Sequence, residues 1–217
     1  MSTPAISPAR PLPRPSSVTG QSAPGVVSSL AAWVPSDLYR MTVDEYERIG
    51  GMLDDPDKVE LIDGYLVRKM SKNPPHVATV KRTYKTLDAL LPAGWTWQKE
   101  DPVRIPEFNE PEPDVAILKG SDSDFTARIP GPSDVALAIE VADSTLERDR
   151  GRKHLAYAYG GVPVYWIINL VESQIEVYSD PAPEGYRSRQ DFKPGQDVPV
   201  VIDGREIGRI AVADILP

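Results

Sequence analysis

The sequence predicts an α/β domain in which helices flank a mixed central β-sheet. Its local patterns follow the order helix, hairpin, helix, strands, helix, strands, which is typical of a sheet covered by helices. Residues 162–168 form an uninterrupted apolar run that suits a strand buried on both faces. The chain has 217 residues, 41% of them hydrophobic, so one domain can bury a substantial core. We expect a disordered tail rich in proline and serine over residues 1–35, and the folded domain over residues 36–217.

The first elements of the domain carry specific end signals. Thr42, followed three residues later by Glu45, is typical of a capping box and predicts a helix that ends near residue 49. Asp63-Gly64 lies between two apolar runs within residues 59–67. Because a type I′ turn needs positive φ at both central residues, this pair predicts a β-hairpin.

The remaining elements follow from periodicity and composition. A second helix is predicted over residues 76–91, where apolar side chains recur at helical spacing. A third is predicted from a capping box at Ser144 and Glu147 to about residue 159. Short runs rich in β-branched and aromatic residues predict strands at residues 95–98, 103–105, 113–118, 135–141, 162–168, 174–179 and 186–192. A last strand and one helical turn are expected between residues 209 and 216.

The composition limits the kinds of site. Cysteine is absent, which excludes a disulfide framework and a thiolate zinc site. The two histidines, His76 and His154, are too few for most imidazole-based metal sites, so a metal would be held mainly by oxygen, as Mg²⁺, Mn²⁺ and Ca²⁺ prefer. No apolar run is long enough to span a membrane, and the N-terminus lacks the apolar region of a secretory signal. We expect a cytoplasmic protein without a membrane partner.

Charge is segregated along the chain. The net charge of −8 argues against a generally basic surface for nucleic acid. Residues 65–87 nevertheless contain no acidic residue and six cationic ones, namely Arg68, Lys69, Lys72, Lys81, Arg82 and Lys85. Residues 100–124 contain eight acidic residues and two cationic ones. The basic segment can be a phosphate-binding surface or a solvated helix face, and the sequence alone leaves both open.

Two acidic residues occupy the better strand candidates. Side chains alternate between the faces of a strand, so Asp114 shares a face with Ala116, and Glu140 shares a face with Ala136 and Ala138. Apolar side chains fill the opposite face of the second strand, namely Val135, Leu137, Ile139 and Val141. A lone buried carboxylate is costly, so Glu140 should be paired, protonated or bound to a cation. If the two strands are neighbours, both carboxylates converge at one edge of the sheet.

Such a pair has a definite chemistry. Two carboxylates can bind a hard divalent cation, which polarises a phosphoryl oxygen and lowers the pKa of a bound water. Lys153 lies on the following helix and could hold the nucleophilic water or neutralise charge on phosphorus. The spacing also allows structural roles, with Asp114 as a strand-entry cap, Glu140 paired with a core arginine and Lys153 on the surface.

The order of several motifs resembles a known family. Pro113-Asp114 comes first, followed by Ala138-Ile-Glu140-Val141, Asp149-Arg-Gly-Arg-Lys153 and Tyr157-Ala-Tyr-Gly-Gly-Val-Pro-Val-Tyr-Trp-Ile-Ile168. Together with the hairpin and His76, this order is similar to the compact bacterial restriction endonuclease family, a branch of the PD-(D/E)XK nuclease superfamily. The resemblance covers residues 40–216 and implies a restriction-endonuclease-like fold.

The resemblance also implies an activity and a site. It implies an endonuclease dependent on Mg²⁺, with Mn²⁺ able to substitute, that hydrolyses phosphodiester bonds, with DNA as the expected substrate. Asp114 and Glu140 would bind the metal, and the Val141 carbonyl would complete its shell. Lys153 would replace the superfamily's strand lysine, because Ala142 occupies that position here. Since cutting both strands usually needs two active sites, a homodimer is implied as well.

Other residues have two interpretations each. Glu60 would be a further acidic site residue that binds a second metal or orients a water, or else a surface residue at a strand end. His76 would contact phosphate or the nucleophile, or else lie on the surface at a helix start. From the basic segment, Lys72, Lys81 and Arg82 would contact the phosphates of nucleic acid.

Two other functions are compatible with the sequence. A nucleic-acid-binding or assembly module could retain this fold without catalysis, because a fold does not prove a function. The acidic balance and the displaced lysine agree with that alternative. A sugar-cleaving enzyme could also use paired carboxylates, but aromatic residues form only 7% of the chain and give no sign of a large aromatic-lined cleft.

Overall fold

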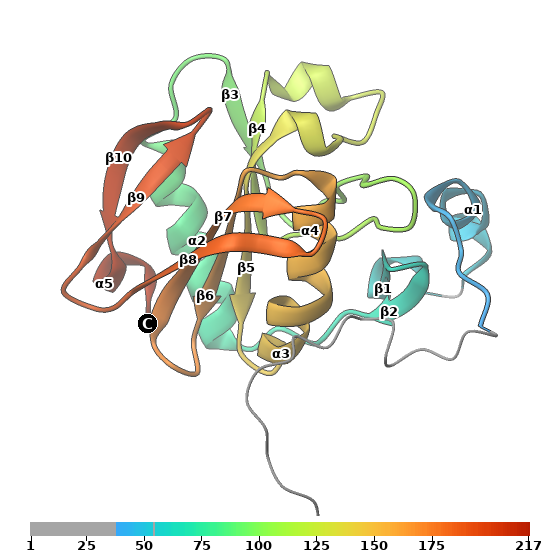
Figure 1. The fold of residues 1–217 in the computed structure, drawn as a ribbon, viewed down its shortest axis with the longest axis horizontal. Coiled ribbons are helices and arrows are strands. Elements are labelled where there is room, and N and C mark those ends of the chain that lie inside the picture. The colour runs from blue at the N-terminus through green and yellow to red at the C-terminus, as the bar shows by residue number, and fades with distance from the viewer. Residues whose placement is uncertain (1–37, 54) are drawn as a thin grey trace, which may run out of the picture.

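A six-stranded mixed sheet forms the centre of the structure, a computed structural model that describes residues 38–53 and 55–217 (Figure 1). The strands, in order across the sheet, are β3 (Trp95–Gln98), β4 (Val115–Lys119), β5 (Val135–Ala142), β6 (Val164–Asn169), β7 (Gln174–Ala182) and β8 (Gly185–Phe192). β5 and β6 are parallel, and every other neighbouring pair in this sheet is antiparallel. The sheet confirms the predicted α/β class. The predicted tail, residues 1–35, lies outside the described residues.

Both faces of the sheet are covered (Figure 1). α2 (Pro74–Asp88) packs on one face through Val80 and Leu87, and it begins two residues before the predicted start. The same core includes a separate two-stranded sheet of β9 (Asp197–Ile202) and β10 (Arg205–Ala211), and α5 (Val212–Ile215). α4 (His154–Gly160) covers the other face with Tyr157. The described residues contain no helix that is long and apolar enough to cross a membrane.

A small unit lies beside the main sheet (Figure 1). It consists of α1 (Val43–Ile49) and the hairpin of β1 (Val59–Ile62) and β2 (Tyr65–Arg68). The predicted capping box is present at the start of α1, and the predicted hairpin turn has φ of 53° at Asp63 and 80° at Gly64. A hydrogen bond of 2.8 Å from the Glu110 N–H to the Leu61 carbonyl ties β1 to the chain that leads into β4. Short 3-10 helices occur at Gly50–Met52, Pro56–Lys58, Asp122–Phe125 and Pro132–Asp134.

The strand predicted at residues 103–105 is wrong. Ile105 makes only an isolated bridge with Asn109, and its neighbours belong to no strand. Pro102 and Pro106 flank this segment, and proline lacks the N–H that a sheet ladder requires. The segment therefore forms the irregular connection that carries the chain to β4.

The C-terminal hairpin was predicted only in part. The sequence predicts one last strand, whereas the structure pairs β9 with β10 in an antiparallel hairpin. The turn between them has φ of 48° at Asp203 and 72° at Gly204, so both central residues have positive φ, as in the first hairpin. The Asp-Gly pair was thus a usable signal at both places.

The predicted alternation along β5 holds only from Leu137 onward. The register between β4 and β5 shifts next to Leu118, which marks a β-bulge. As a result, Val135 packs in the core on the α4 side and Ala136 in the core on the α2 side, the reverse of the prediction. Glu140 lies beyond the bulge, so its predicted face is not affected.

The third helix is not the continuous helix that was predicted. It consists of α3 (Leu146–Arg148), a π-helical segment (Asp149–Lys153) and α4. The capping box predicted at Ser144 is wrong, because Thr145 precedes the first turn and no side chain caps it. The Tyr165 hydroxyl donates to the Asp149 carbonyl at 3.1 Å. A side chain inserted at a helix carbonyl is a common cause of such local widening.

Candidate functional site

A polar pocket opens at the end of the sheet where β4 begins and β5 ends. It encloses about 620 Å³ of space, part of which is open to solvent. Its acidic side chains are Glu60, Glu100, Glu112, Asp114, Glu140, Asp143 and Asp149. Its basic side chains are Lys69, Lys72, His76, Arg148 and Lys153. All four residues predicted to carry catalysis therefore line one pocket, together with His76, Lys72 and Val141.

The strand register brings Asp114 and Glu140 together. Val115 pairs with Ile139 in the antiparallel ladder of β4 and β5, so one further step places Asp114 opposite Glu140. The Val141 N–H donates to Asp114 Oδ2 at 2.8 Å. Both carboxylates are buried, with 7% of Asp114 and 4% of Glu140 exposed. Water therefore cannot fully solvate them, and their partners decide their charge.

Asp114 is held as an ionised carboxylate. His76, in the first turn of α2, places Nε2 3.2 Å from Asp114 Oδ2. Burial raises the pKa of Asp114, but the hydrogen bond and charge of His76 and the Val141 N–H outweigh burial, so the pKa lies below its ordinary value. Lys72 Nζ lies 4.0 Å from Asp114 Oδ1.

Lys153 is buried between two carboxylates from different parts of the fold. Its Nζ lies 2.8 Å from Glu140 Oε1 on β5 and 2.9 Å from Glu60 Oε2 on β1, and it donates to the Glu112 carbonyl at 3.4 Å. Burial lowers the pKa of Lys153, but the charges of Glu140 and Glu60 outweigh burial and raise it, so the ammonium stays charged. A surface position for Lys153 is therefore wrong, since only 3% of it is exposed.

Glu140 is a buried carboxylate with two hydrogen-bond donors on one of its oxygens. Oε1 accepts from Lys153 and also from the Tyr157 hydroxyl at 2.9 Å. Burial raises the pKa of Glu140 well above its ordinary value, although Lys153 opposes this. A further positive charge in the pocket would favour the ionised form.

The donor set fits a hard divalent cation in type. Asp114 Oδ1 and Glu140 Oε2 accept no hydrogen bond from any described residue. Glu60 Oε1 and Asp149 Oδ1 are buried without a partner among those residues. Carboxylate oxygens are the ligands that Mg²⁺ and Mn²⁺ prefer. Within residues 38–53 and 55–217, however, no three histidine or acidic side chains are grouped as a ready cation site, so backbone or water ligands would have to contribute.

Two predicted nucleic-acid contacts lie away from this pocket. Lys81 and Arg82 are on α2 but do not line it, and Arg82 Nη1 donates to the Leu216 carbonyl at 2.6 Å. Lys72 and Lys69 do line it, and both pair with the acidic segment: Lys72 with Glu100 and Lys69 with Glu112, each at 2.7 Å. Part of the basic segment thus faces the acidic segment across the pocket.

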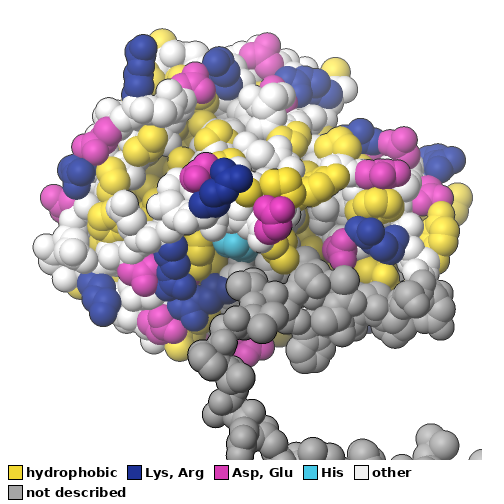
Figure 2. Space-filling view, viewed as in Figure 1, with side chains coloured by type: hydrophobic (Ala, Val, Ile, Leu, Met, Phe, Trp, Pro, Cys, Tyr) yellow, Lys and Arg dark blue, Asp and Glu magenta, His cyan; other side chains and the backbone are white. Residues whose placement is uncertain are grey.

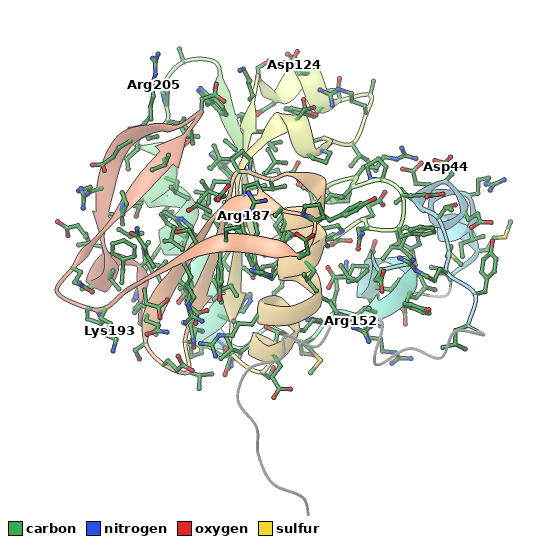
Figure 3. The ribbon with its side chains drawn as sticks, viewed as in Figure 1. Asp44, Asp124, Arg152, Arg187, Lys193 and Arg205 are labelled. Atoms are coloured by element: carbon green, nitrogen blue, oxygen red, sulfur yellow. The ribbon has the colours of Figure 1, made fainter. Side chains whose placement is uncertain are left out.

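Charged side chains of both signs are present on the face of the molecule that Figure 2 draws. Figure 2 shows Lys and Arg side chains interspersed with Asp and Glu on that face. Figure 3 shows Asp44 on α1, Lys193 in the connection after β8 and Arg205 at the start of β10, around the outline of the molecule. The basic side chains that line the pocket itself are Lys69, Lys72, His76, Arg148 and Lys153.

The sequence interpretation missed two residues of the site. Tyr157 was named only as part of a motif, yet it is completely buried and its hydroxyl contacts Glu140. Asp149 was part of a motif without a role of its own, yet it is buried and lines the pocket. Both lie four residues from Lys153, one before and one after it, and this helical spacing was the available signal.

Comparisons with known proteins agree with this fold. The sequence model of the Uma2 family, described as "Putative restriction endonuclease", matches residues 43–210. A crystal structure of "a putative nuclease belonging to DUF820" from Anabaena variabilis superposes with a TM-score of 0.62. The two chains are 17% identical, and the match covers 81% of this chain and 97% of the other. No curated protein matches. At such low identity, the structural match shows a shared fold only.

Proposed function

The chain belongs to the Uma2 family of restriction endonuclease-like proteins, and from this premise we propose that it is a metal-dependent endonuclease that hydrolyses phosphodiester bonds in DNA. One observation carries the proposal. Asp114 and Glu140 meet on neighbouring strands in a polar pocket, beside a buried lysine that bridges Glu140 and Glu60. This arrangement supports phosphoryl chemistry better than the binding of a neutral ligand, because it combines clustered carboxylates with cationic groups at the rim.

Asp114 Oδ1 and Glu140 Oε2 would hold the cation, with the Val141 carbonyl as the proposed backbone ligand. A bound Mg²⁺ or Mn²⁺ supplies polarisation of a phosphoryl oxygen and a lowered pKa for water. The chain's own groups do the rest. His76 and the Val141 N–H fix Asp114 Oδ2, so that Oδ1 remains available. Lys153 offsets the charge of the buried carboxylates.

Lys72 is the proposed contact to a substrate phosphate at the rim. It is partly exposed and lies between Glu100 and Asp114 Oδ1, at 2.7 and 4.0 Å. A phosphate that enters the pocket would replace Glu100 as its partner. Charge-assisted hydrogen bonds of this kind orient a phosphate and add affinity that salt weakens.

Cleavage assays test the activity. Purified protein with Mg²⁺ or Mn²⁺ is expected to cut supercoiled or linear DNA, and Asp114→Ala and Glu140→Ala are expected to lose at least 100-fold of that rate, on the order of what one key electrostatic group contributes. Glu184→Ala changes an exposed carboxylate outside the pocket and should cut like the wild type. If no metal supports cleavage of supercoiled, linear or single-stranded DNA or of RNA, the proposal fails.

The enclosed position of Lys153 favours one alternative, a module that binds nucleic acid without cutting it. Lys153 Nζ donates hydrogen bonds to Glu140 Oε1 and to the Glu112 carbonyl and forms an ion pair with Glu60, so its donors are largely engaged within the protein. Binding of DNA that persists in EDTA, without cleavage under any metal, would support that alternative.

A homodimer is proposed for cutting both strands, and light scattering coupled to gel filtration would reveal it.

A further inference from the structure

The Tyr157 hydroxyl lies where it can control Glu140. Tyr157 is fully buried on α4, four residues after Lys153, and its hydroxyl donates to Glu140 Oε1 at 2.9 Å. We propose that Tyr157 is a positioning residue which, with Lys153, fixes Oε1 of Glu140 so that Oε2 faces the pocket as a ligand. This inference rests on the proposed function, because it assigns Oε2 to the cation.

The hydrogen bonds around Glu140 are divided unequally between its two oxygens. Oε1 accepts from Lys153 at 2.8 Å and from Tyr157 at 2.9 Å. Oε2 accepts from no described residue. Two donors to the same oxygen leave the carboxylate little freedom to rotate, since rotation would break one or both bonds. The unused oxygen is therefore held in one place.

Lys153 alone would not give this result. Its ammonium also pairs with Glu60 and donates to the Glu112 carbonyl. It can therefore move closer to Glu60 or to Glu140 as the charges of these two carboxylates change. Tyr157 has one donor and one partner. The hydroxyl thus keeps Glu140 in place even when Lys153 shifts its contacts toward Glu60.

The aromatic ring of Tyr157 is itself immobilised. It packs against the Tyr165 ring, with 5.0 Å between the ring centroids, within the core on the α4 side. Tyr165 in turn donates its hydroxyl to the Asp149 carbonyl, at the start of the π-helical segment that carries Lys153. The two donors to Glu140 thus lie on consecutive segments, the π-helical segment and α4, and the tyrosine contacts pack both against the sheet.

Substitution of a residue that hydrogen-bonds to a metal ligand commonly lowers metal affinity by about 10- to 100-fold. We therefore expect Tyr157→Phe to weaken Mn²⁺ binding about tenfold in the full chain, as measured by electron paramagnetic resonance of free Mn²⁺. Tyr186→Phe is the matched control, because the hydroxyl of this partly buried tyrosine donates to the Val162 carbonyl, outside the pocket. That variant should lose comparable thermal stability yet bind Mn²⁺ like the wild type.

The outcomes separate this inference from the proposed function. Equal Mn²⁺ affinity in Tyr157→Phe and the wild type overturns the positioning role while the metal site stands. If the wild type binds no Mn²⁺, the proposed function fails, and a metal-free crystal structure of Tyr157→Phe decides the positioning role. An unchanged Glu140 carboxylate there refutes it, and a rotated carboxylate supports it. Should Tyr157→Phe not fold, 4-fluorophenylalanine at position 157 fills the same volume without a donor and takes its place in both measurements.

Discussion

At the scale of single residues, the pocket holds more negative than positive charge in buried positions. Lys153 carries one positive charge between Glu140 and Glu60, so this group alone has an excess of one negative charge when all three are ionised. Buried ions are tolerated only when they are paired and hydrogen-bonded. A further cation nearby would balance the excess negative charge. Without one, the repulsion between the two carboxylates is only partly offset by Lys153.

Removing the central cation should destabilise the protein. In Lys153→Met, Glu140 and Glu60 would be buried without their positive partner, and breaking a buried pair costs about 3–5 kcal/mol. We expect a loss of about 3 kcal/mol in the free energy of unfolding, measured by urea titration with the slope unchanged. Adding Glu60→Gln and Glu140→Gln to Lys153→Met should recover much of it. A single variant as stable as the wild type would show that the cluster is not coupled.

Alternation along strands was enough to predict that Asp114 and Glu140 meet, because both strands are regular at their pocket ends. The same reasoning could not predict the partners of Lys153. Its contacts depend on where the hairpin of β1 docks, and no local pattern encodes that position. Tyr157 was missed for a different reason: burial of an aromatic ring accounts for the residue without any role for its hydroxyl.

At the scale of elements, the helical segments over the site contain two glycines, of which the backbone requires only one. Gly161 ends α4 with φ of 77°, in the left-handed region that favours glycine. Gly151 lies within the π-helical segment without positive φ, and a Cβ added there would meet nothing within 4 Å. The first glycine is required by the backbone and the second is not.

Alanine substitutions should therefore have opposite effects on stability. Gly161→Ala is expected to lower the free energy of unfolding by about 1 kcal/mol, because the alanine Cβ strains the left-handed conformation. Gly151→Ala should raise it by about 0.5 kcal/mol, since it reduces the entropy of the unfolded chain. Thermal unfolding of both variants measures the difference. Equal effects of the same sign would contradict this assignment.

A second buried carboxylate joins three elements away from the pocket. Glu176 on β7 is fully buried and accepts hydrogen bonds from Arg150 in the π-helical segment and from Asn169 at the end of β6. Burial raises the pKa of Glu176, but the hydrogen bonds from Arg150 and Asn169 outweigh it and lower the pKa to about 2. Its charged form thus stabilises the contact between helix and sheet.

The stability supplied by Glu176 should depend on pH. Its pKa is about 2 in the fold against an ordinary 4.5, so it contributes about 3 kcal/mol above pH 4.5 and loses this as pH falls toward 2. Glu176→Gln should therefore be less stable than the wild type at pH 6, with the gap closing between pH 4.5 and 2. Urea titrations across this range measure it. A gap that stays constant with pH would exclude the charge as its cause.

Most elements could be predicted from the sequence because their signals are local. Capping residues, Asp-Gly turns and apolar periodicity gave α1, the first hairpin, α2 and the central strands. The failures involve tertiary contacts. The bulge beside Leu118 depends on how β4 pairs with β5, and the widening of the helix at Asp149 depends on its contact with Tyr165. The sequence alone does not give the positions of these neighbours. The β9–β10 hairpin is the exception, because its Asp203-Gly204 signal was present.

At the scale of the whole molecule, charge segregation along the chain becomes charge opposition across the pocket. Lys69 and Lys72 from the basic segment pair with Glu112 and Glu100 from the acidic segment. These pairs hold the chain between β2 and α2 against the start of β4. Of the other cationic residues in the basic segment, Arg68 ends β2, whereas Lys81, Arg82 and Lys85 lie on α2, where Lys81 is exposed and outside the pocket lining. The net charge of the whole chain, −8, does not reveal this separation of basic and acidic segments.

This division predicts which lysines meet a nucleic acid. If phosphates enter only at the rim of the pocket, Lys72→Ala should weaken binding of a DNA oligonucleotide and reduce the slope of log affinity against log salt by about 1. Lys81→Ala removes the same charge from the exposed face of α2 and should leave both quantities unchanged. Fluorescence anisotropy in EDTA, at several salt concentrations, measures them without cleavage. Equal reductions in both variants would instead mean that nucleic acid also lies along α2, and that the basic segment acts as one surface.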